Sequence, residues 1–345
     1  MSIGLNIRCI RKITHIKSPI SNITILSPSG AINPDYINGA AERLQKLGYN
    51  VVISPHAYGE CGRFSGTDEE RLADINNALQ DPSVNAILCA RGGYGLQRII
   101  DKINLSTLDS PLSTLDSPLS TLDYPPTLIG FSDITALHQL YALHHTPYTI
   151  HGLMCKHIAT LPEDSEALQL FFRALAREPL EYILPPHPLN RSGEAQGTLI
   201  GGNLSVLYGL QGTPYDLNHV IDAHPEGVIL FIEDIGERHY HIDRMMNNLR
   251  MAGVLSRIKG LVVGQFTDCE PDPGMKISNI KYPYGVSRSE EISNIYATIR
   301  EAVEAYSYPI LFDFPAGHVE DNRPLYLNHP ATLITTGQSA SLLQP

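Results

Sequence analysis

Apolar runs alternate with helical patterns through the first half of the chain. Residues 22–30 and 49–54 are predicted strands, and residues 36–48 between them have the apolar spacing of a helix. A strand, a helix and a strand in this order form a βαβ unit, in which the two strands lie parallel. A second helix over 67–79 and a third strand over 84–90 continue the pattern. The first half is therefore predicted to form a parallel, Rossmann-like sheet.

The stretch 127–135, Thr-Leu-Ile-Gly-Phe-Ser-Asp-Ile-Thr, predicts a short strand, a tight turn and the start of a helix. A serine at such a turn is held at the end of the sheet, where the N–H groups of the first helical turn point at whatever reacts with it. Ser132 is thus a candidate nucleophile. The pattern Gly-x-Ser-Asp lacks the second glycine of the usual nucleophile elbow, so helix capping by Ser132 or Asp133 is the alternative interpretation.

A heptapeptide repeat precedes this stretch. Ser-Thr-Leu-Asp-Ser-Pro-Leu occurs at 106–112 and again at 113–119, and an altered third copy fills 120–126. Each copy contains proline, and the copies lack the pattern of charged residues at the e and g positions of a coiled-coil heptad. Both features argue against a coiled coil. We interpret 106–126 as a surface loop that was lengthened by tandem duplication and has no chemical role.

The second half of the chain differs from the first. Residues 179–193 contain four prolines and little apolar periodicity, which predicts a linker between two domains, 18–178 and 194–340. The second domain is predicted to be a β-rich α/β domain, with strands over 197–204, 227–234 and 258–266, helices over 240–252 and 292–305, and short β segments over 310–336. The predicted fold class is α/β throughout.

Composition narrows the possible functions. The 345 residues, 43% of them hydrophobic, suffice for about two domains, and a net charge of −11 disfavours a nucleic acid or an anionic membrane as partner. Five scattered cysteines without a Cys-x-x-Cys pair indicate neither a disulfide framework nor a thiolate zinc site. No apolar run approaches the ~20 residues of a membrane span, and residues 1–17 lack the apolar core of a signal peptide. We expect a cytoplasmic protein without a metal.

Other segments offer candidate functional groups. The pair Gly92-Gly93 follows a strand, where backbone N–H groups can approach a ligand, although a plain tight turn is the simpler interpretation. The predicted strand 227–234 ends in Glu233 and Asp234, and a carboxylate there can orient an imidazole. Spacing alone does not choose among four histidines that could supply that imidazole, namely His151, His239, His241 and His318.

Several motifs, taken in order, resemble those of the LD-carboxypeptidase family, the serine peptidase family S66 that also includes the microcin C7 self-immunity proteins. The resemblance runs from about residue 20 to about residue 335. The motifs are Arg91-Gly92-Gly93-Tyr94-Gly95, Gly130-Phe131-Ser132-Asp133-Ile134-Thr135, His151-Gly152, Gly201-Gly202-Asn203-Leu204, Ile232-Glu233-Asp234, Tyr240-His241-Ile242-Asp243-Arg244 and Gly317-His318.

The resemblance implies a catalytic triad. Ser132 would be the nucleophile, His318 the general base and Glu233 the acid that orients it. The oxyanion hole would be the backbone N–H groups of Asp133 and Gly93, with that of Gly92 as the second choice. The sequence departs from the family in the 106–126 insertion and in the segment that begins at Pro324, where the family has Pro-x-Gly.

The resemblance also implies a substrate. The enzyme would hydrolyse the bond between an L-diamino acid and a terminal D-alanine in muropeptide tetrapeptides during peptidoglycan recycling, as a homodimer and without a cofactor. Arg91, Gly92, Asn203 and Arg244 are candidates for binding that substrate. One alternative is an immunity-type peptidase that cleaves aminoacyl-nucleotide antibiotics, and another is a non-catalytic two-lobed protein that binds an anion or a peptide.

Overall fold

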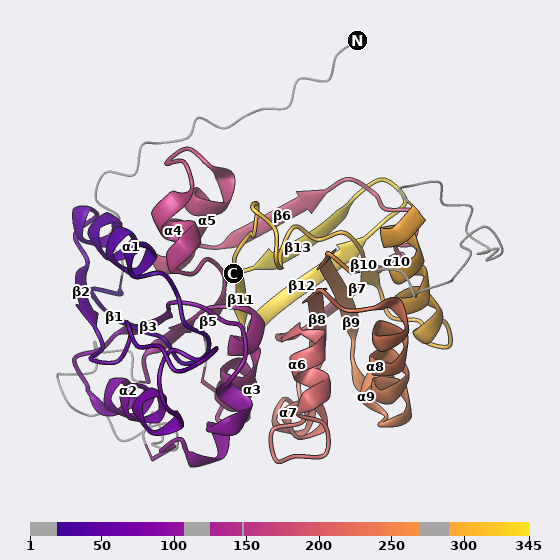
Figure 1. Cartoon of the computed structure of the whole chain (residues 1–345). Helices are drawn as coiled ribbons and strands as arrows, with labels where there is room; N and C mark the ends of the chain where they lie inside the picture. The colour runs from indigo at the N-terminus through magenta and orange to yellow at the C-terminus, as the bar shows by residue number, and fades with distance from the viewer. Residues whose placement is uncertain (1–18, 107–124, 147, 270–289) are drawn as a thin grey trace, which may run out of the picture.

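The structure is a computed structural model that describes residues 19–106, 125–146, 148–269 and 290–345. Most of the heptapeptide repeat, and with it the prediction of a surface loop, lies outside these ranges. Two sheets with helices packed on them form two lobes that meet along the middle of the molecule (Figure 1). The predicted α/β class with a β-rich second domain is confirmed.

The first sheet has the strand order β11-β5-β4-β3-β1-β2, and its first five strands in sequence are parallel. Those strands are β1 (Asn22–Leu26), β2 (Asn50–Ile53), β3 (Ala86–Cys89), β4 (Thr127–Ile129) and β5 (Thr149–His151). The helices of this lobe are α1 (Pro34–Lys46), α2 (Asp68–Gln80), α3 (Thr135–Leu143), α4 (Cys155–Thr160) and α5 (Glu166–Leu175), with short 3-10 turns η1 (Leu96–Arg98), η2 (Ile100–Lys102) and η4 (Ser132–Ile134). Because β4 lies between β3 and β5, the loops that follow these three strands meet at one edge of the sheet.

The second sheet has the order β10-β9-β8-β7-β12-β13-β6 and is mixed, because β7 to β10 are parallel and the rest are antiparallel. Its strands are β6 (Leu180–Leu184), β7 (Gly193–Asn203), β8 (Val228–Ile235), β9 (Gly260–Thr267), β10 (Ile310–Leu311), β12 (His329–Thr335) and β13 (Ala340–Gln344). The helices are α6 (Leu204–Gly209), α7 (Leu217–Ala223), α8 (His239–Met251), α9 (Val254–Arg257) and α10 (Glu290–Ala302).

The segment 179–193 is more than the linker that its prolines predict. Its residues Leu180–Leu184 form β6, the edge strand of the second sheet, which pairs antiparallel with β13. Leu180 and Tyr182 are buried on one face of this strand, while Ile183 is exposed on the other. This alternation of period two is the signal of a half-buried strand, and the flanking prolines obscure it in the sequence.

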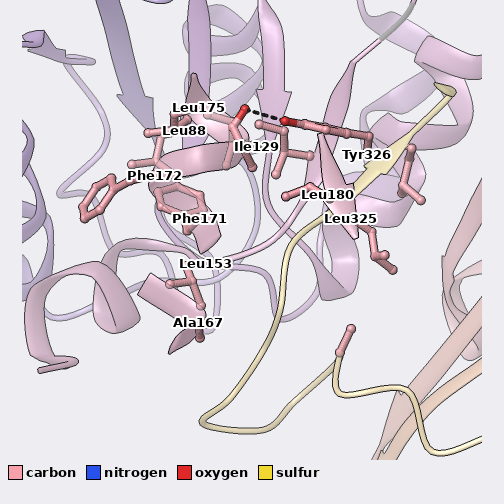
Figure 2. Close-up of a cluster of buried hydrophobic side chains, with 14 of the residues drawn as sticks. Leu88, Ile129, Leu153, Ala167, Phe171, Phe172, Leu175, Leu180, Leu325 and Tyr326 are labelled. Carbon is pink, nitrogen blue, oxygen red and sulfur yellow. Dashed lines mark hydrogen bonds between the residues drawn. The ribbon is translucent and has the colours of Figure 1, made fainter. Parts of the chain in front are cut away.

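One of the hydrophobic clusters contains residues of both lobes. Strand β11 (Leu325–Leu327) belongs to the C-terminal half of the chain but pairs antiparallel with β5 of the first sheet. Figure 2 shows Leu325 and Tyr326 beside side chains of the N-terminal half such as Ile129 and Phe171. The Tyr326 hydroxyl also donates to the backbone carbonyl of Ala174 at 3.2 Å. A continuous close-packed core resists hinge motion, so the two lobes hold a fixed geometry at their junction.

Candidate active site

Ser132 lies at the carboxyl end of β4, against the glycine loop that follows β3. The two strands are parallel neighbours with Leu88 opposite Ile129, so their ends carry Gly92 and Ser132 to the same place. A Cβ atom added to Gly92 would lie 2.8 Å from the Cβ of Ser132 and 3.0 Å from the carbonyl oxygen of Phe131. Only glycine fits this contact without displacing the Ser132 turn.

Ser132 has a strained backbone. Its φ of 67° lies in the left-handed region, which few residues other than glycine adopt, and this is the conformation of a nucleophile at a sharp strand-to-helix turn. The side chain of Asp133 anchors the turn from behind, since its Oδ2 accepts hydrogen bonds from the Ser29 hydroxyl at 2.7 Å and the Leu96 N–H at 3.0 Å. Burial nevertheless holds the pKa of the Asp133 carboxyl above its ordinary value.

Two backbone N–H groups beside Ser132 are free to donate. Neither the N–H of Gly93 nor that of Asp133 donates to any residue within the described ranges. The carbonyl of Gly92 accepts from the N–H of Gly30 at 3.0 Å, and in a trans peptide the carbonyl and the following N–H point in opposite directions. The N–H of Gly93 therefore points away from Gly30.

His318 and Glu233 form a hydrogen-bonded pair in the second lobe. Glu233 lies near the end of β8 and is fully buried, and its Oε2 accepts a hydrogen bond from Nδ1 of His318 at 2.8 Å. His318 follows Gly317, whose φ is +129° and where a Cβ would lie 2.9 Å from Oε2 of Glu233. A glycine at 317 thus lets the chain turn directly over the carboxylate and present the imidazole beyond it.

The electrostatics of the pair favour a charged imidazole. Burial alone would lower the pKa of His318, but the hydrogen bond and charge of Glu233, with the charge of Asp234, outweigh burial and raise that pKa above its ordinary value. The neighbouring Asp234 is buried as well, and burial together with the charge of Glu233 raises its pKa to about 7.

One cavity joins the two lobes. It has a volume of about 530 Å³, and both Ser132 and His318 line it. Phe131 contacts His318 edge-on, with ring centroids 4.9 Å apart. The other side chains and backbone segments that line the cavity are Ile32, Asn33, Tyr36, Ala90, Arg91, Gly92, Gly93, Met154, Lys156, His157 and Ile235.

The structure separates the four histidines that spacing leaves open. His151 is buried between Phe131 and Phe231, away from the cavity wall, and burial holds its pKa well below the ordinary value. Nε2 of His239 bonds to the Thr298 hydroxyl at 2.6 Å, and Nδ1 of His241 to Glu237 at 2.8 Å. Of the four, His318 alone both lines the cavity and bonds to a carboxylate at the end of β8.

The predicted substrate-binding residues divide into two groups. Arg91 and Gly92 line the cavity, whereas Asn203 and Arg244 do not. Asn203 is buried, caps α6 by accepting from the Val206 N–H, and donates to Asp234 at 2.9 Å. Both ends of its amide are therefore used inside the protein. Arg244 is exposed on α8, where its guanidinium lies over the ring of Tyr240.

Sequence reasoning missed one part of the cavity wall. Met154, Lys156 and His157 reach the cavity from the segment that follows β5. Burial and the charge of Lys156 lower the pKa of His157 to about 4, so its imidazole is neutral at neutral pH. The motif His151-Gly152 marks the preceding turn, but nothing in the residue pattern says that the following helix faces Ser132.

Two negative findings apply only to the part of the chain that the structure covers. There, no three His, Cys, Asp or Glu side chains gather in a way that could hold a metal ion, and no helix has the length and apolarity to cross a membrane. The expectation that no metal or cofactor is needed stays a prediction.

Comparisons with known proteins agree with this architecture. Residues 23–152 match the family model described as the LD-carboxypeptidase N-terminal domain, and residues 196–333 match its C-terminal domain. A probable murein peptide carboxypeptidase of Bacillus subtilis is 29% identical, over 92% of this chain and 90% of its own. The crystal structure of a muramoyltetrapeptide carboxypeptidase from Oxalobacter formigenes has a TM-score of 0.72 and 25% identity, over 94% of this chain and 98% of its own.

A microcin C7 self-immunity protein has a TM-score of 0.72 over 96% of this chain and 98% of its own, and at 19% identity this likeness concerns the fold alone. The family models and the carboxypeptidase relatives define the class of protein: the chain is a serine carboxypeptidase, a hydrolase. The two domain models together cover most of the sequence, and the chain belongs to the LD-carboxypeptidase family.

Proposed function

We propose that the protein hydrolyses the bond between an L-diamino acid and the terminal D-alanine of muropeptide tetrapeptides, with Ser132, His318 and Glu233 as its catalytic triad. The observation that carries the proposal is a cavity lined by both Ser132 and His318, with His318 hydrogen-bonded to the buried Glu233. The murein peptide activities named for the relatives support the substrate class.

In the proposed reaction His318 takes the proton of the Ser132 hydroxyl through Nε2, because Nδ1 is engaged with Glu233. The Ser132 oxygen attacks the carbonyl carbon of the L-diamino acid and forms a tetrahedral intermediate. His318 then donates the proton to the leaving amine, so D-alanine departs and an acyl-enzyme remains. Water, activated by the same imidazole, hydrolyses the ester and regenerates Ser132.

The oxyanion of the intermediate would be bound by the N–H groups of Gly93 and Asp133. Their lack of a partner among the described residues supports this role, as does the close contact of Gly92 with Ser132. Each such donor typically contributes a factor of about 10²–10³ to the rate. The division into domains at 179–193, a place in peptidoglycan recycling, a cytoplasmic location and a homodimer remain predictions.

The direct test is release of D-alanine from a purified muropeptide tetrapeptide, measured by chromatography. We expect turnover by the wild-type protein and a loss of at least about 10⁴-fold in Ser132→Ala, which retains its melting temperature. Full activity in Ser132→Ala would remove that residue from the mechanism. If the wild type leaves the tetrapeptide intact but cleaves an aminoacyl-nucleotide analogue, the immunity-type alternative replaces this proposal.

A further inference from the structure

A hydrogen bond crosses the junction between the lobes close to Ser132 in the chain. Thr135 begins α3, and its hydroxyl oxygen accepts a hydrogen bond from the backbone N–H of Asn203 at 2.9 Å. Thr135 belongs to the first lobe, whereas Asn203 is the last residue of β7 in the second. Both residues are buried. The helix that follows the candidate nucleophile is thus bonded directly to the other lobe.

Gly202 allows this close approach. Its φ is +139°, and a Cβ atom added there would collide with the Thr135 hydroxyl and lie 3.0 Å from the Thr135 methyl carbon. The side chain of Thr135 therefore lies against the backbone of Gly202, where α3 packs on β7. Any other residue at 202 would displace the Thr135 side chain.

Asn203 carries the connection on towards Glu233. Its side-chain Nδ2 donates to Oδ1 of Asp234 at 2.9 Å, and Asp234 is the neighbour of Glu233 on β8. The Asp234 carboxylate is itself held, because it also accepts from the backbone N–H groups of Ser205 at 2.8 Å and Ile235 at 2.9 Å. The Thr135–Asn203–Asp234 bridge therefore ends beside the residue that holds His318.

The bridge joins the two halves of the proposed triad by a second route. At one end the 3-10 turn that begins with Ser132 runs directly into α3 at Thr135. At the other end Asp234 follows Glu233, which bonds to His318. Apolar packing between the lobes is non-directional, whereas a hydrogen bond restricts both distance and angle. The bridge can therefore restrain the junction more closely than apolar packing alone.

We propose that the Thr135–Asn203–Asp234 bridge sets the distance between the Ser132 hydroxyl and the His318 imidazole, with Thr135 as a positioning residue. This inference rests on the proposed function. Thr135 does not line the cavity, so it acts through the position of Ser132 and not through contact with substrate. A general base must lie within hydrogen-bond reach of the proton that it takes, so a small displacement lowers kcat without weakening substrate binding.

The test is Thr135→Val, which replaces the hydroxyl by a methyl group and leaves the N–H of Asn203 without its acceptor. We expect kcat for release of D-alanine from the muropeptide tetrapeptide to fall about 10- to 100-fold. KM and the acid limb of kcat/KM should stay at their wild-type values, because Glu233 still holds His318. Thr135→Ser keeps the hydroxyl and restores most of kcat, whereas Thr135→Ala removes it and repeats the loss.

Thr127→Val is the matched control. Thr127 begins β4, the strand that leads to Ser132, and is buried, but its hydroxyl accepts from Arg177 at 3.3 Å within the N-terminal half of the chain. This variant keeps the wild-type kcat.

All rates are measured well below the melting temperature of each variant, so that a loss of stability alone does not change kcat. Wild-type kcat in Thr135→Val and Thr135→Ala, or an equal loss in Thr135→Ser, overturns the positioning role while wild-type turnover upholds the proposed function. Failure of the wild type to cleave the tetrapeptide overturns the proposed function and this inference with it.

Discussion

The two sides of the candidate active site are built in different ways. Ser132 and its supports come from a short strand, its turn and the neighbouring glycine loop, all positioned by adjacent parallel strands. Glu233 and His318 are 85 residues apart and meet only because β8 and the segment after β10 end near each other. Local backbone geometry thus positions the Ser132 hydroxyl, whereas long-range packing positions the His318 imidazole.

This difference gives the shared core a functional role. Neither lobe holds all three proposed triad residues, so the position of the cavity depends on the junction between the lobes. Strand β11 crosses that junction, and its Leu325 and Tyr326 pack with the N-terminal half (Figure 2). A rigid junction meets the requirement that reacting groups lie within hydrogen-bond reach of one another.

Among changes that leave the Ser132 hydroxyl and the His318 imidazole in place, the largest loss is expected from Glu233→Gln. The variant keeps the shape of the side chain but removes the charge that orients and stabilises the imidazolium, so kcat should fall about 10³- to 10⁴-fold. The pH profile should change as well. Glu233 raises the pKa of His318 while burial lowers it, so without the carboxylate that pKa falls. The acid limb of kcat/KM, which reports loss of the neutral base, then moves to lower pH.

The control for this change is Glu226→Gln, a glutamate that precedes the other end of β8 and contacts Thr198 and His224. It should leave both the rate and the acid limb unchanged. An acid limb in Glu233→Gln that coincides with that of the wild type would show that Glu233 does not set the protonation of the base.

On the nucleophile side we expect a smaller but clear loss from Gly92→Ala. The added Cβ conflicts with the backbone of the Ser132 turn and shifts the proposed oxyanion donor at Gly93, which should lower kcat by about 10²- to 10³-fold. Gly337→Ala is the matched control, because a Cβ there meets nothing within 4 Å. Equal kcat values in the two variants would argue that the Gly92 contact has no catalytic consequence.

The smallest effect is expected from the heptapeptide repeat. Deletion of one copy, residues 113–119, should leave kcat/KM and the melting temperature nearly unchanged, because it returns the segment towards a shorter connection between the same two elements. Steady-state kinetics and thermal melting check this expectation. A large drop in turnover would instead assign the repeat to a lid or a subunit contact.

The sequence predicts the local half of the architecture well. The alternation of strands and helices up to residue 152 indicates the parallel sheet, and the motif around Ser132 indicates its sharp turn, because both are short-range patterns. The choice of His318 over His151 came from resemblance alone. Two features of the structure distinguish His318: its hydrogen bond to Glu233, 85 residues away in the sequence, and its place in the cavity wall. Neither feature leaves a local pattern in the sequence.

Long-range pairing explains the remaining differences. Nothing near Leu325–Leu327 indicates that this strand joins the first sheet, and the prolines around Leu180–Leu184 hide an edge strand of the second. Asn203 was a substrate-binding candidate from its motif, but the fold uses its amide to cap α6 and hold Asp234. Met154, Lys156 and His157 belong to no motif, and only the fold shows that they line the cavity.

The most direct measurement of whether the two lobes act together is a double-mutant cycle. It compares kcat for tetrapeptide hydrolysis in Ser132→Ala, in His318→Ala and in the double variant, with folding checked by circular dichroism. If the two side chains work as one unit, each single change lowers kcat by about 10⁴-fold or more and the double variant is no slower than either. If the two losses multiply, or if His318→Ala keeps its activity, the imidazole of one lobe does not serve the hydroxyl of the other.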